Sequence, residues 1–373
     1  MTGGVSDMRT QVLIIGGGIT GLRIGSLLSE TDISFKIIES RERLGGRVLT
    51  KNLDSSNYFD LGPTWFWPDN EKNIEKLLKE YNIPTIEQYN EGDSLLDLSE
   101  TQTPKRFQSS NVNPASKRIV GGVNSLVEAL KDNVPQSHIE LHAKVKSISS
   151  KTNHPHSIEI LNQYTNEIET IKADIIVSTL PPRLVVNSIS FTPPLPETLQ
   201  LDLLNKPTWM GAQAKIVVTY EKAFWRNDGL SGNVISWAGP LREIYDATTP
   251  EGKAALFGFF SLPPSIRNEK SEETIKNLVI KQLIKLFGNE AQYFENIFYK
   301  DWSQDFHTVT EGDKLNIESF PSYGPSPQHL SHILFSGTEF DEEHGGHIEG
   351  ALSSANQTFK KIKDILGNNS IIK

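Results

Sequence analysis

The sequence predicts an α/β protein in which a discontinuous Rossmann-like domain is interrupted by an inserted domain of mixed β-sheet and helices. Three observations lead to this fold class. A strand, a glycine-rich turn, a helix and a second strand follow one another from Gln11 to Ser40. A strand ending in glycine and a helix follow from His332 to Leu366. Between them lie proline-punctuated strands, and 373 residues are enough for two cores.

The first unit is predicted to be a βαβ arrangement with a right-handed crossover. The β-branched run Gln11–Ile15 predicts a buried strand, which the following glycines end. Ile19–Ser29 predicts a helix, because three leucines and a glycine recur on one face. Phe35–Ser40 predicts the second strand of the unit.

The next region is predicted to alternate helices with irregular chain. A helix is expected near Asn70–Tyr81, with Asp69 or Asn70 as its N-cap. Residues 87–118 are polar and poorly periodic, which indicates loops and short strands. A short helix is expected within residues 121–135.

Alternation of apolar and polar residues predicts most remaining strands. Helices are expected at Glu272–Phe287 and Gly346–Leu366. This order assigns 1–68, 117–200 and 319–373 to the Rossmann-like domain, and 69–116 and 201–318 to the inserted domain, which would hold the substrate. The strands are predicted at 139–150, 156–163, 166–180, 212–225, 233–239, 243–250, 254–262, 295–302 and 332–340.

Composition excludes several classes of protein. The net charge of −9 argues against a nucleic-acid partner, which needs a basic surface. The absence of cysteine excludes disulfides and thiolate metal sites. No apolar run reaches bilayer length, and the first residues lack a signal-peptide core, so we expect a cytoplasmic protein without a membrane partner.

Two glycine-containing motifs indicate a nucleotide site. Gly16, Gly18 and Gly21 fit the G-x-G-x-x-G pattern, in which glycines allow the turn, the approach of phosphates and close helix packing. Glu39 ends the second strand, where an acid accepts ribose hydroxyls. The alternative is a glycine-rich turn without a ligand.

The second motif places two glycines between Arg43 and Arg47. This pattern combines close backbone approach with fixed positive charge that suits phosphate. The alternative is a surface turn with solvated arginines.

These motifs continue along the chain in a recognisable order. The segments "IIGGGITGL", "IIESRERLGGRV", "YFDLGPTWF", "RIVGGVNSLVEAL", "DIIVSTLPPRLVVNSISFTPPLP", "QAKIVVTYEKAFW" and "SGTEFDEEHGGHIEGALSSA" occur from residue 14 to residue 355. Together they resemble the flavin-containing amine oxidase family, which includes the monoamine oxidases and, more distantly, protoporphyrinogen oxidase. The resemblance covers nearly the whole chain and implies FAD as the cofactor.

The resemblance also implies roles for individual residues. The glycine turn, Glu39, Arg41 and Arg47 would hold the ADP half, and Val145 would offer its backbone to adenine. Gly62–Trp65 would line the isoalloxazine, and Ile348 would donate its amide to the flavin pyrimidine. The implied cofactor-binding residues are Gly16, Gly18, Ile19, Thr20, Gly21, Glu39, Ser40, Arg41, Gly46, Arg47, Gly62, Pro63, Thr64, Trp65, Val145, Thr179, Gly337, Glu339, Gly346, His347 and Ile348.

Lys215 is the candidate catalytic residue. It interrupts an apolar strand, and a buried lysine is costly unless it is paired or functional. In the family a lysine at this position holds a water near flavin N5 and assists reoxidation by dioxygen. The alternative is an outward-facing lysine on an alternating strand. Trp65 and Trp302 would lie near the substrate, although simple core packing would also explain Trp302.

The chain departs from the family pattern where the substrate binds. His347 takes a position where many members have an aromatic ring, and Phe320 or Tyr323 would have to supply a second ring. His347 could stack on the substrate, donate a hydrogen bond, act as acid or base, or be a spacer. No metal site is expected, because His344 and His347 lack a third ligand. Without cysteine, FAD should be non-covalent. The segment Asp69–Ser116 is shorter than usual, which suggests a more open cavity.

The resemblance implies an FAD-dependent oxidoreductase that takes a hydride from the carbon beside an amine nitrogen. Dioxygen would accept the electrons, and hydrogen peroxide would be released. Two alternatives stay open at this point. One is a desaturase that dehydrogenates a carbon–carbon bond, as protoporphyrinogen oxidase does. The other is a flavin-binding, redox-sensing module without turnover.

Overall fold

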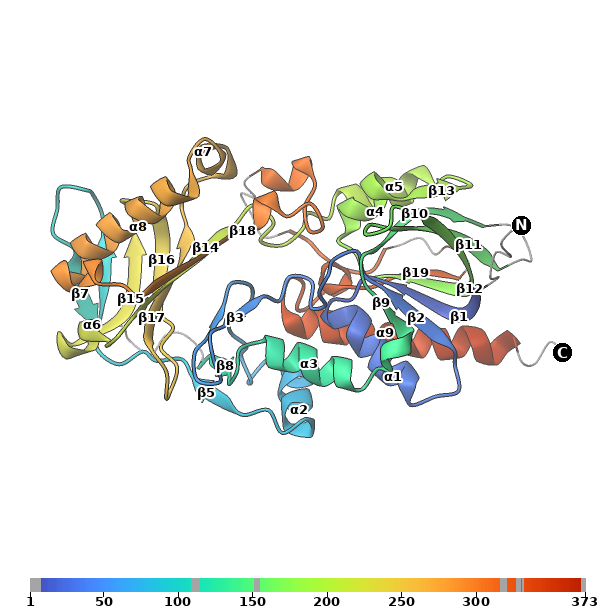
Figure 1. Ribbon diagram of the computed structural model, residues 1–373, viewed down its shortest axis with the longest axis horizontal. Helices are drawn as coiled ribbons and strands as arrows, with labels where there is room; N and C mark the ends of the chain where they lie inside the picture. The colour runs from blue at the N-terminus through green and yellow to red at the C-terminus, as the bar shows by residue number, and fades with distance from the viewer. Residues whose placement is uncertain are drawn as a thin grey trace.

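The computed structural model describes residues 8–108, 115–150, 155–315, 321–326, 330 and 332–369. It contains two large sheets at opposite ends of an elongated molecule, with α9 (Ile348–Asn369) running under the first sheet from the middle to one end (Figure 1). The predicted α/β fold class is confirmed.

The first sheet is the Rossmann-like one. Its strand order is β13-β10-β11-β12-β1-β2-β9, and β19 pairs with β12. The pairs β12–β1, β1–β2 and β2–β9 are parallel, and the β1–β2 pair agrees with the predicted βαβ unit. The strands are β1 (Met8–Ile15), β2 (Phe35–Ile38), β9 (Ile139–Glu140), β10 (Ala143–Ser149), β11 (His156–Asn162), β12 (Ile168–Ser178), β13 (Ser190–Thr192) and β19 (Ile333–Phe335).

The two faces of this sheet pack against different elements. On β1, Val12 and Ile14 face a core built with α1 (Ile19–Ser29), α3 (Asn124–Asp132) and α9. Leu13 and Ile15 face the antiparallel strands β10 and β11 instead. Two short helices, α4 (Pro182–Ser188) and α5 (Glu197–Leu204), pack on each other and on Phe191 of β13 and Phe335 of β19. Because Val12–Ile15 are all buried, this part of β1 is a continuous apolar run and does not alternate.

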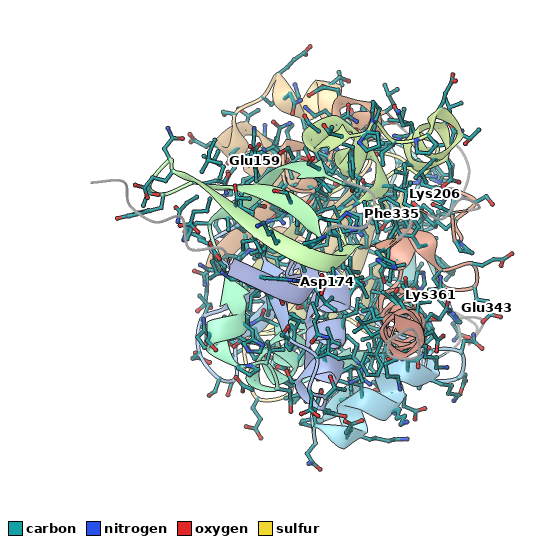
Figure 2. All side chains as sticks on the ribbon, turned by 90° about the vertical axis from the view of Figure 1, so that its right-hand side faces the viewer. Glu159, Asp174, Lys206, Phe335, Glu343 and Lys361 are labelled. Atoms are coloured by element: carbon teal, nitrogen blue, oxygen red, sulfur yellow. The ribbon has the colours of Figure 1, made fainter. Side chains whose placement is uncertain are left out.

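Helix α9 also lies beside β19, the short strand that pairs with β12. Lys361 on α9 and Phe335 on β19 line one small hollow, and Figure 2 shows α9 there nearly end-on. Within the described chain, no helix is long and apolar enough to cross a membrane.

The second sheet has the order β18-β14-β17-β16-β15-β6-β7 and is mainly antiparallel. Helix α8 (Glu272–Phe287) covers one face and was predicted with these bounds; Ser271 caps it by accepting from the Thr274 amide. The strands are β6 (Asp93–Asp97), β7 (Lys105–Gln108), β14 (Ala214–Tyr220), β15 (Leu230–Ser236), β16 (Leu241–Asp246), β17 (Ala254–Phe260) and β18 (Asn296–Asp301). The remaining elements are β3 (Thr50–Asn52), β4 (Tyr58–Asp60), β5 (Thr85–Glu87), β8 (Lys117–Ile119), α6 (Phe224–Asn227) and α7 (Pro264–Asn268).

Helix α2 (Lys72–Glu80) differs from the prediction in its cap and in its packing. Neither Asp69 nor Asn70 is the N-cap, which is Glu71. The amides of its first turn are bound by Glu349 of α9, a residue distant in sequence, so a local cap is not needed. The apolar face of α2 packs into the same core as α1 and α9. The predicted domain boundary after residue 68 therefore does not separate the core of the Rossmann-like domain from that of the inserted domain.

Candidate functional site

A cavity of about 380 Å³ lies between the two sheets. Most of the residues predicted from the sequence line it together, although they come from distant parts of the chain. They are Gly16, Gly18, Ile19, Thr20, Glu39, Arg41, Gly46, Arg47, Gly62, Pro63, Thr64, Trp65, Thr179, Lys215, Trp302, Gly337, Gly346, His347 and Ile348.

The glycine turn leaves open space at the start of α1. A Cβ on Gly18 would lie 3.9 Å from the Cα of Gly46 and meet nothing nearer, so this point can admit a bulky group. Gly16 has φ +108°, a conformation that favours glycine. Gly21 does not line the cavity: a Cβ there would lie 2.0 Å from the Gly16 oxygen, so this glycine permits close helix–strand packing.

Glu39 is held rigidly at the same end of the cavity. One carboxylate oxygen accepts from the Gly17 amide at 2.7 Å, and the other accepts from the Arg41 amide at 2.8 Å. The side chain is buried. The oxygen bound by Arg41 also lies 3.5 Å from the Ser40 hydroxyl, whereas the oxygen bound by Gly17 keeps a further acceptor site. This arrangement suits an acceptor for ribose hydroxyls.

The loop after β18 closes over this end of the cavity. Arg41 donates to Asp305 and to Thr308, both at 2.7 Å. His307 lines the cavity, and its Nδ1 lies 2.9 Å from the hydroxyl of Ser40. Burial and the nearby Arg41 guanidinium lower the pKa of His307. The second domain therefore contributes to the predicted nucleotide end, which the sequence did not indicate.

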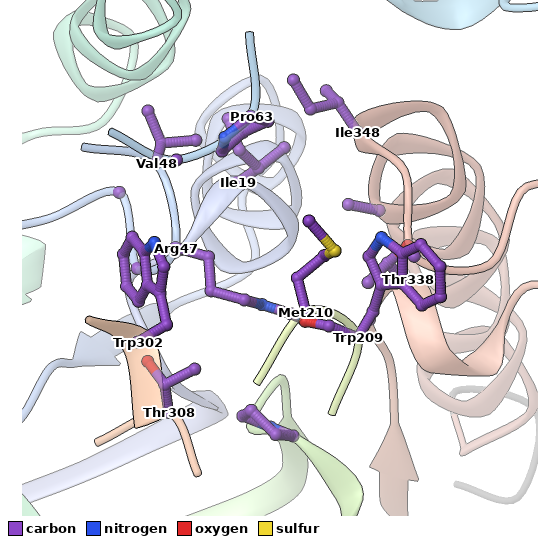
Figure 3. A pocket seen from close by; sticks show the side chains of 18 of the residues that line it. Ile19, Arg47, Val48, Pro63, Trp209, Met210, Trp302, Thr308, Thr338 and Ile348 are labelled. Carbon is purple, nitrogen blue, oxygen red and sulfur yellow. The ribbon is translucent and has the colours of Figure 1, made fainter. Parts of the chain in front are cut away.

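Arg47 crosses the middle of the cavity. Its guanidinium makes a bidentate pair with Glu339, at 2.7 and 2.9 Å, and reaches the Trp209 carbonyl at 3.4 Å. Figure 3 shows this side chain extended between Trp302 on one side and Trp209 on the other. Burial alone would lower the pKa of Arg47, but the Glu339 carboxylate outweighs it and raises that pKa.

The pair explains the place of Glu339, which lies behind Arg47 and not on the cavity wall. Arg43, the other arginine of the predicted phosphate motif, has a different role. It donates to the carbonyls of Leu44, Gly46 and Val48 and thereby fixes the loop.

Lys215 lies on the face of β14 that meets the cavity, so the outward-facing alternative is wrong. Its ammonium donates to the Gly62 carbonyl at 3.0 Å and to the hydroxyl of Thr64. The ring of Phe257 lies 4.2 Å from Nζ, and the side chain is only 2% exposed. Burial lowers the pKa of Lys215 to about 7, although the Asp60 carboxylate opposes this change. Such a group changes protonation near neutral pH.

The segment Gly62–Trp65 forms the wall beside this lysine. A Cβ on Gly62 would lie 2.2 Å from the Arg47 carbonyl oxygen, so only glycine fits there. Trp65 donates to Gln88 at 2.8 Å and packs on the ring of Tyr245. Trp302 is buried and donates to the Leu61 carbonyl at 2.9 Å, yet it also lines the cavity.

The start of α9 differs from what its glycines suggested. The resemblance implied that Gly346, which follows Gly345, binds the cofactor. A Cβ on Gly346 would instead lie 2.7 Å from the Trp209 ring, and one on Gly345 would lie 2.5 Å from Tyr323. The glycines thus admit two protein rings, and the helix begins at Ile348, on the cavity wall.

His347 faces the cavity beside two residues that were not predicted. Its Nδ1 lies 2.7 Å from the Glu71 carboxylate. The Trp67 ring lies 5.5 Å from the imidazole, tilted by 35°. His344 lies apart, with its Nδ1 4.0 Å from Asp341. No group of three or more metal-binding side chains occurs among the residues that are described.

Some predicted positions lie off the cavity wall. Ser40 contacts His307 but does not line the cavity. Val145 is buried in β10, at a bulge in the pairing with β11. Tyr323 does not supply the second ring, because it packs on Gly345 and donates to the Pro207 carbonyl. Phe320 lies outside the described residues.

The sequence did not single out several residues that line the cavity. Three of them, Trp67, Trp209 and Phe259, are aromatic. Trp67 follows the "GPTWF" segment at a spacing of two from Trp65, a strand-like alternation that could have indicated a shared wall. Trp209 lies in a turn after α5, where no periodic signal exists. The others are Val48, Leu61, Leu180, Pro181, Met210, Gln213, His307, Thr308, Thr338 and Ala351.

Comparisons with known proteins agree with this architecture. In fold, the chain is similar to putrescine oxidase bound to putrescine, with a TM-score of 0.79, 21% identity and coverage of 95% of this chain and 99% of that one. Cyclohexylamine oxidase from Brevibacterium oxydans IH-35A also gives 0.79, at 16% identity and coverage of 96% and 99%. A probable flavin-containing monoamine oxidase A of Dictyostelium discoideum is 23% identical over 97% of this chain and 99% of its own length.

Family models identify the chain more directly. Residues 14–81 match the NAD(P)-binding Rossmann-like domain. Residues 96–358, more than half of the chain, match the flavin containing amine oxidoreductase model. This family implies a flavin cofactor. The resemblance stated from the motifs is confirmed, and the chain belongs to the flavin-containing amine oxidoreductase family.

Proposed function

We propose that the protein is an FAD-dependent amine oxidase, which oxidises an amine at the carbon beside nitrogen and passes the electrons to dioxygen. The observation that carries this proposal is Lys215, a buried lysine with a near-neutral pKa beside Gly62 and Thr64. Relatives named monoamine oxidase and neighbours named putrescine oxidase and cyclohexylamine oxidase support an amine as the substrate.

The cavity fits FAD at both ends. Open backbone at Gly18, the fixed Glu39 carboxylate and the Arg47 guanidinium would hold the ADP half. The first turn of α9 at Ile348 presents amides and the positive end of the helix dipole, which favour negative charge on the flavin. With no cysteine in the sequence to form a thioether, we infer non-covalent binding.

Bound FAD would supply the hydride acceptor and then the electrons that reduce dioxygen to hydrogen peroxide. The chain itself supplies orientation, a dry surface and a proton site. Aromatic walls from Trp65, Trp302 and Phe259 strip water from the amine, and a neutral amine is a better hydride donor than an ammonium. Lys215 Nζ can hold or release a proton close to neutral pH.

The division into an FAD-binding domain and a substrate domain follows the same logic. The Rossmann-like sheet would hold the cofactor, and the β14 face of the second sheet would meet the substrate. Helix α2, although expected with the substrate domain, would belong to the cofactor side because of its packing. A cytoplasmic location and the absence of nucleic-acid partners are kept as predictions.

The proposal is tested with the purified protein in air. We expect a yellow protein whose flavin is released by denaturation, and one hydrogen peroxide formed for each aldehyde or ketone when a suitable amine is added. A colourless protein that FAD cannot reconstitute would refute the cofactor. A yellow protein that forms no peroxide with a broad panel of primary, secondary and diamine substrates would refute the amine oxidase function.

A further inference from the structure

A histidine–glutamate pair lies at the wall of the cavity, at the position where the sequence predicts a departure from the family pattern. His347 lines the cavity and its side chain is 37% exposed, whereas the Glu71 side chain is only 4% exposed. The two groups are joined at 2.7 Å between Nδ1 and Oε1. Glu71 itself is not part of the cavity wall, so it acts from behind the imidazole.

The pair is fixed by a reciprocal contact between the starts of two helices. Glu71 precedes α2 and binds His347, which directly precedes α9. Glu349, in the first turn of α9, accepts from the Asn73 and Ile74 amides of α2, each at 2.9 Å. Each helix start therefore supplies a carboxylate to the other. The second oxygen of Glu71 accepts from the Trp67 amide at 2.7 Å, so its carboxylate has a single orientation.

This geometry indicates which ring nitrogen of His347 is left to accept a proton. A buried carboxylate is an acceptor, so neutral His347 carries its proton on Nδ1 and donates it to Glu71. Nε2 is then left with a lone pair, on the part of the ring away from Glu71. The Trp67 ring, 5.5 Å away, supports the imidazole in this orientation. A carboxylate that orients a histidine in this way also stabilises the imidazolium that forms when Nε2 gains a proton.

We propose that His347, oriented by Glu71, is the base that takes a proton from the substrate ammonium before oxidation. This inference rests on the proposed function, and it names the substrate class as amines that arrive protonated. In this step one N–H bond of the ammonium breaks and an Nε2–H bond forms. The substrate becomes the neutral amine, His347 becomes an imidazolium paired with Glu71, and no electrons are transferred.

Few other titratable groups surround the imidazole. Glu71 and the outward-directed Lys72 come from the start of α2, and the turn before α9 contributes His344 with Asp341. Glu349, in the first turn of α9, is bound to the amides of α2. Elsewhere on the cavity wall, Lys215 and Arg47 have partners of their own.

The first test needs no turnover. In the FAD-loaded protein labelled with ¹⁵N-histidine, the His347 signals are assigned by their loss in His347→Gln. We expect the neutral ring to be protonated at Nδ1 and free at Nε2, and we expect Glu71→Gln to change that balance. A ring protonated at Nε2 in the native protein would overturn the proposal, whatever the substrate is.

The second test separates proton transfer from packing. Anaerobic flavin reduction is followed with two matched amines, one protonated at neutral pH and a fluorinated analogue that is largely neutral. For the protonated amine, His347→Gln and His347→Phe should lower the second-order rate constant of flavin reduction by roughly 100-fold, the lower end of the contribution of a general base. The fluorinated analogue should lose far less, and raising the pH should restore much of the rate with the protonated amine.

The control is His344→Gln, because this histidine lies in the same turn but off the cavity wall. This variant should leave the rate of flavin reduction by both amines unchanged. His347→Phe keeps an aromatic ring without a base, so full activity of this variant with the protonated amine would overturn the proposal. Failure of the native protein to react with any amine is a different result, and it would refute the proposed function itself.

Discussion

Replacing Lys215 by methionine should change how the stability of the protein depends on pH. In the folded chain the pKa of Lys215 is lowered from 10.5 to about 7, chiefly by burial. Burying the ammonium therefore lowers the free energy of unfolding. This penalty has its full size below about pH 7 and disappears as the pH rises towards the pKa of the unfolded state. At about 1.36 kcal/mol for each pKa unit, the full penalty is roughly 4–5 kcal/mol.

The variant also loses two hydrogen bonds, to Gly62 and Thr64, but this loss does not depend on pH. The informative quantity is therefore the difference in unfolding free energy between the two proteins, compared at two pH values. Between about pH 7 and about pH 9 the native protein should gain about 2 kcal/mol of unfolding free energy relative to Lys215→Met, because the folded lysine loses its proton while the unfolded one keeps it.

The assay is denaturant unfolding of both proteins in excess FAD at the two pH values, followed by tryptophan fluorescence. The exposed Lys222, just beyond the end of β14, provides the control, because its ammonium is solvated in both states. Lys222→Met should follow the native pH dependence. If native protein and Lys215→Met also show parallel pH dependences, the lysine is not buried as an uncompensated cation and the reasoning is wrong.

Two further predictions concern charge and space at the site. Arg118 lowers the pKa of Lys215 through its positive charge, whereas Asp60 raises it. Arg118→Met should therefore move the Lys215 titration to higher pH, and Asp60→Asn should move it to lower pH. The pH dependence of flavin reoxidation by dioxygen measures both shifts. If the two variants shift this dependence in the same direction, the electrostatic explanation is wrong. Gly346→Ala should destabilise the protein by about 1–3 kcal/mol, because alanine is strained at φ +88° and its Cβ would meet Trp209. Thermal unfolding with and without FAD measures this loss, and an unchanged melting temperature would refute it.

Local sequence signals were sufficient to bring three residues of the predicted nucleotide end together. Gly16, Gly18 and Glu39 lie within one βαβ unit, so their spacing alone places them together. Lys215 was also predictable, because a charged residue inside an apolar strand must be explained by a partner or a function. The motif order added the family and hence the expectation of a flavin.

Contacts between distant segments could not be predicted in the same way. Asp69 and Asn70 have the residue types of an N-cap, but Glu349 binds the first amides of α2 from another helix. The glycines before α9 indicated a close approach, while the approaching rings, Trp209 and Tyr323, come from segments without periodicity. Local patterns indicate that a position needs a hydrogen-bonding partner or room for a neighbouring group. Only the tertiary fold shows which residue is that partner or neighbour.

The most direct test of the account is anaerobic mixing of the FAD-loaded protein with amines, followed by admission of air. The account predicts that at least one amine bleaches the visible flavin absorbance without oxygen, and that air restores the absorbance with release of hydrogen peroxide. A protein that retains its flavin but is bleached by no amine would contradict the central claim that this cavity oxidises amines.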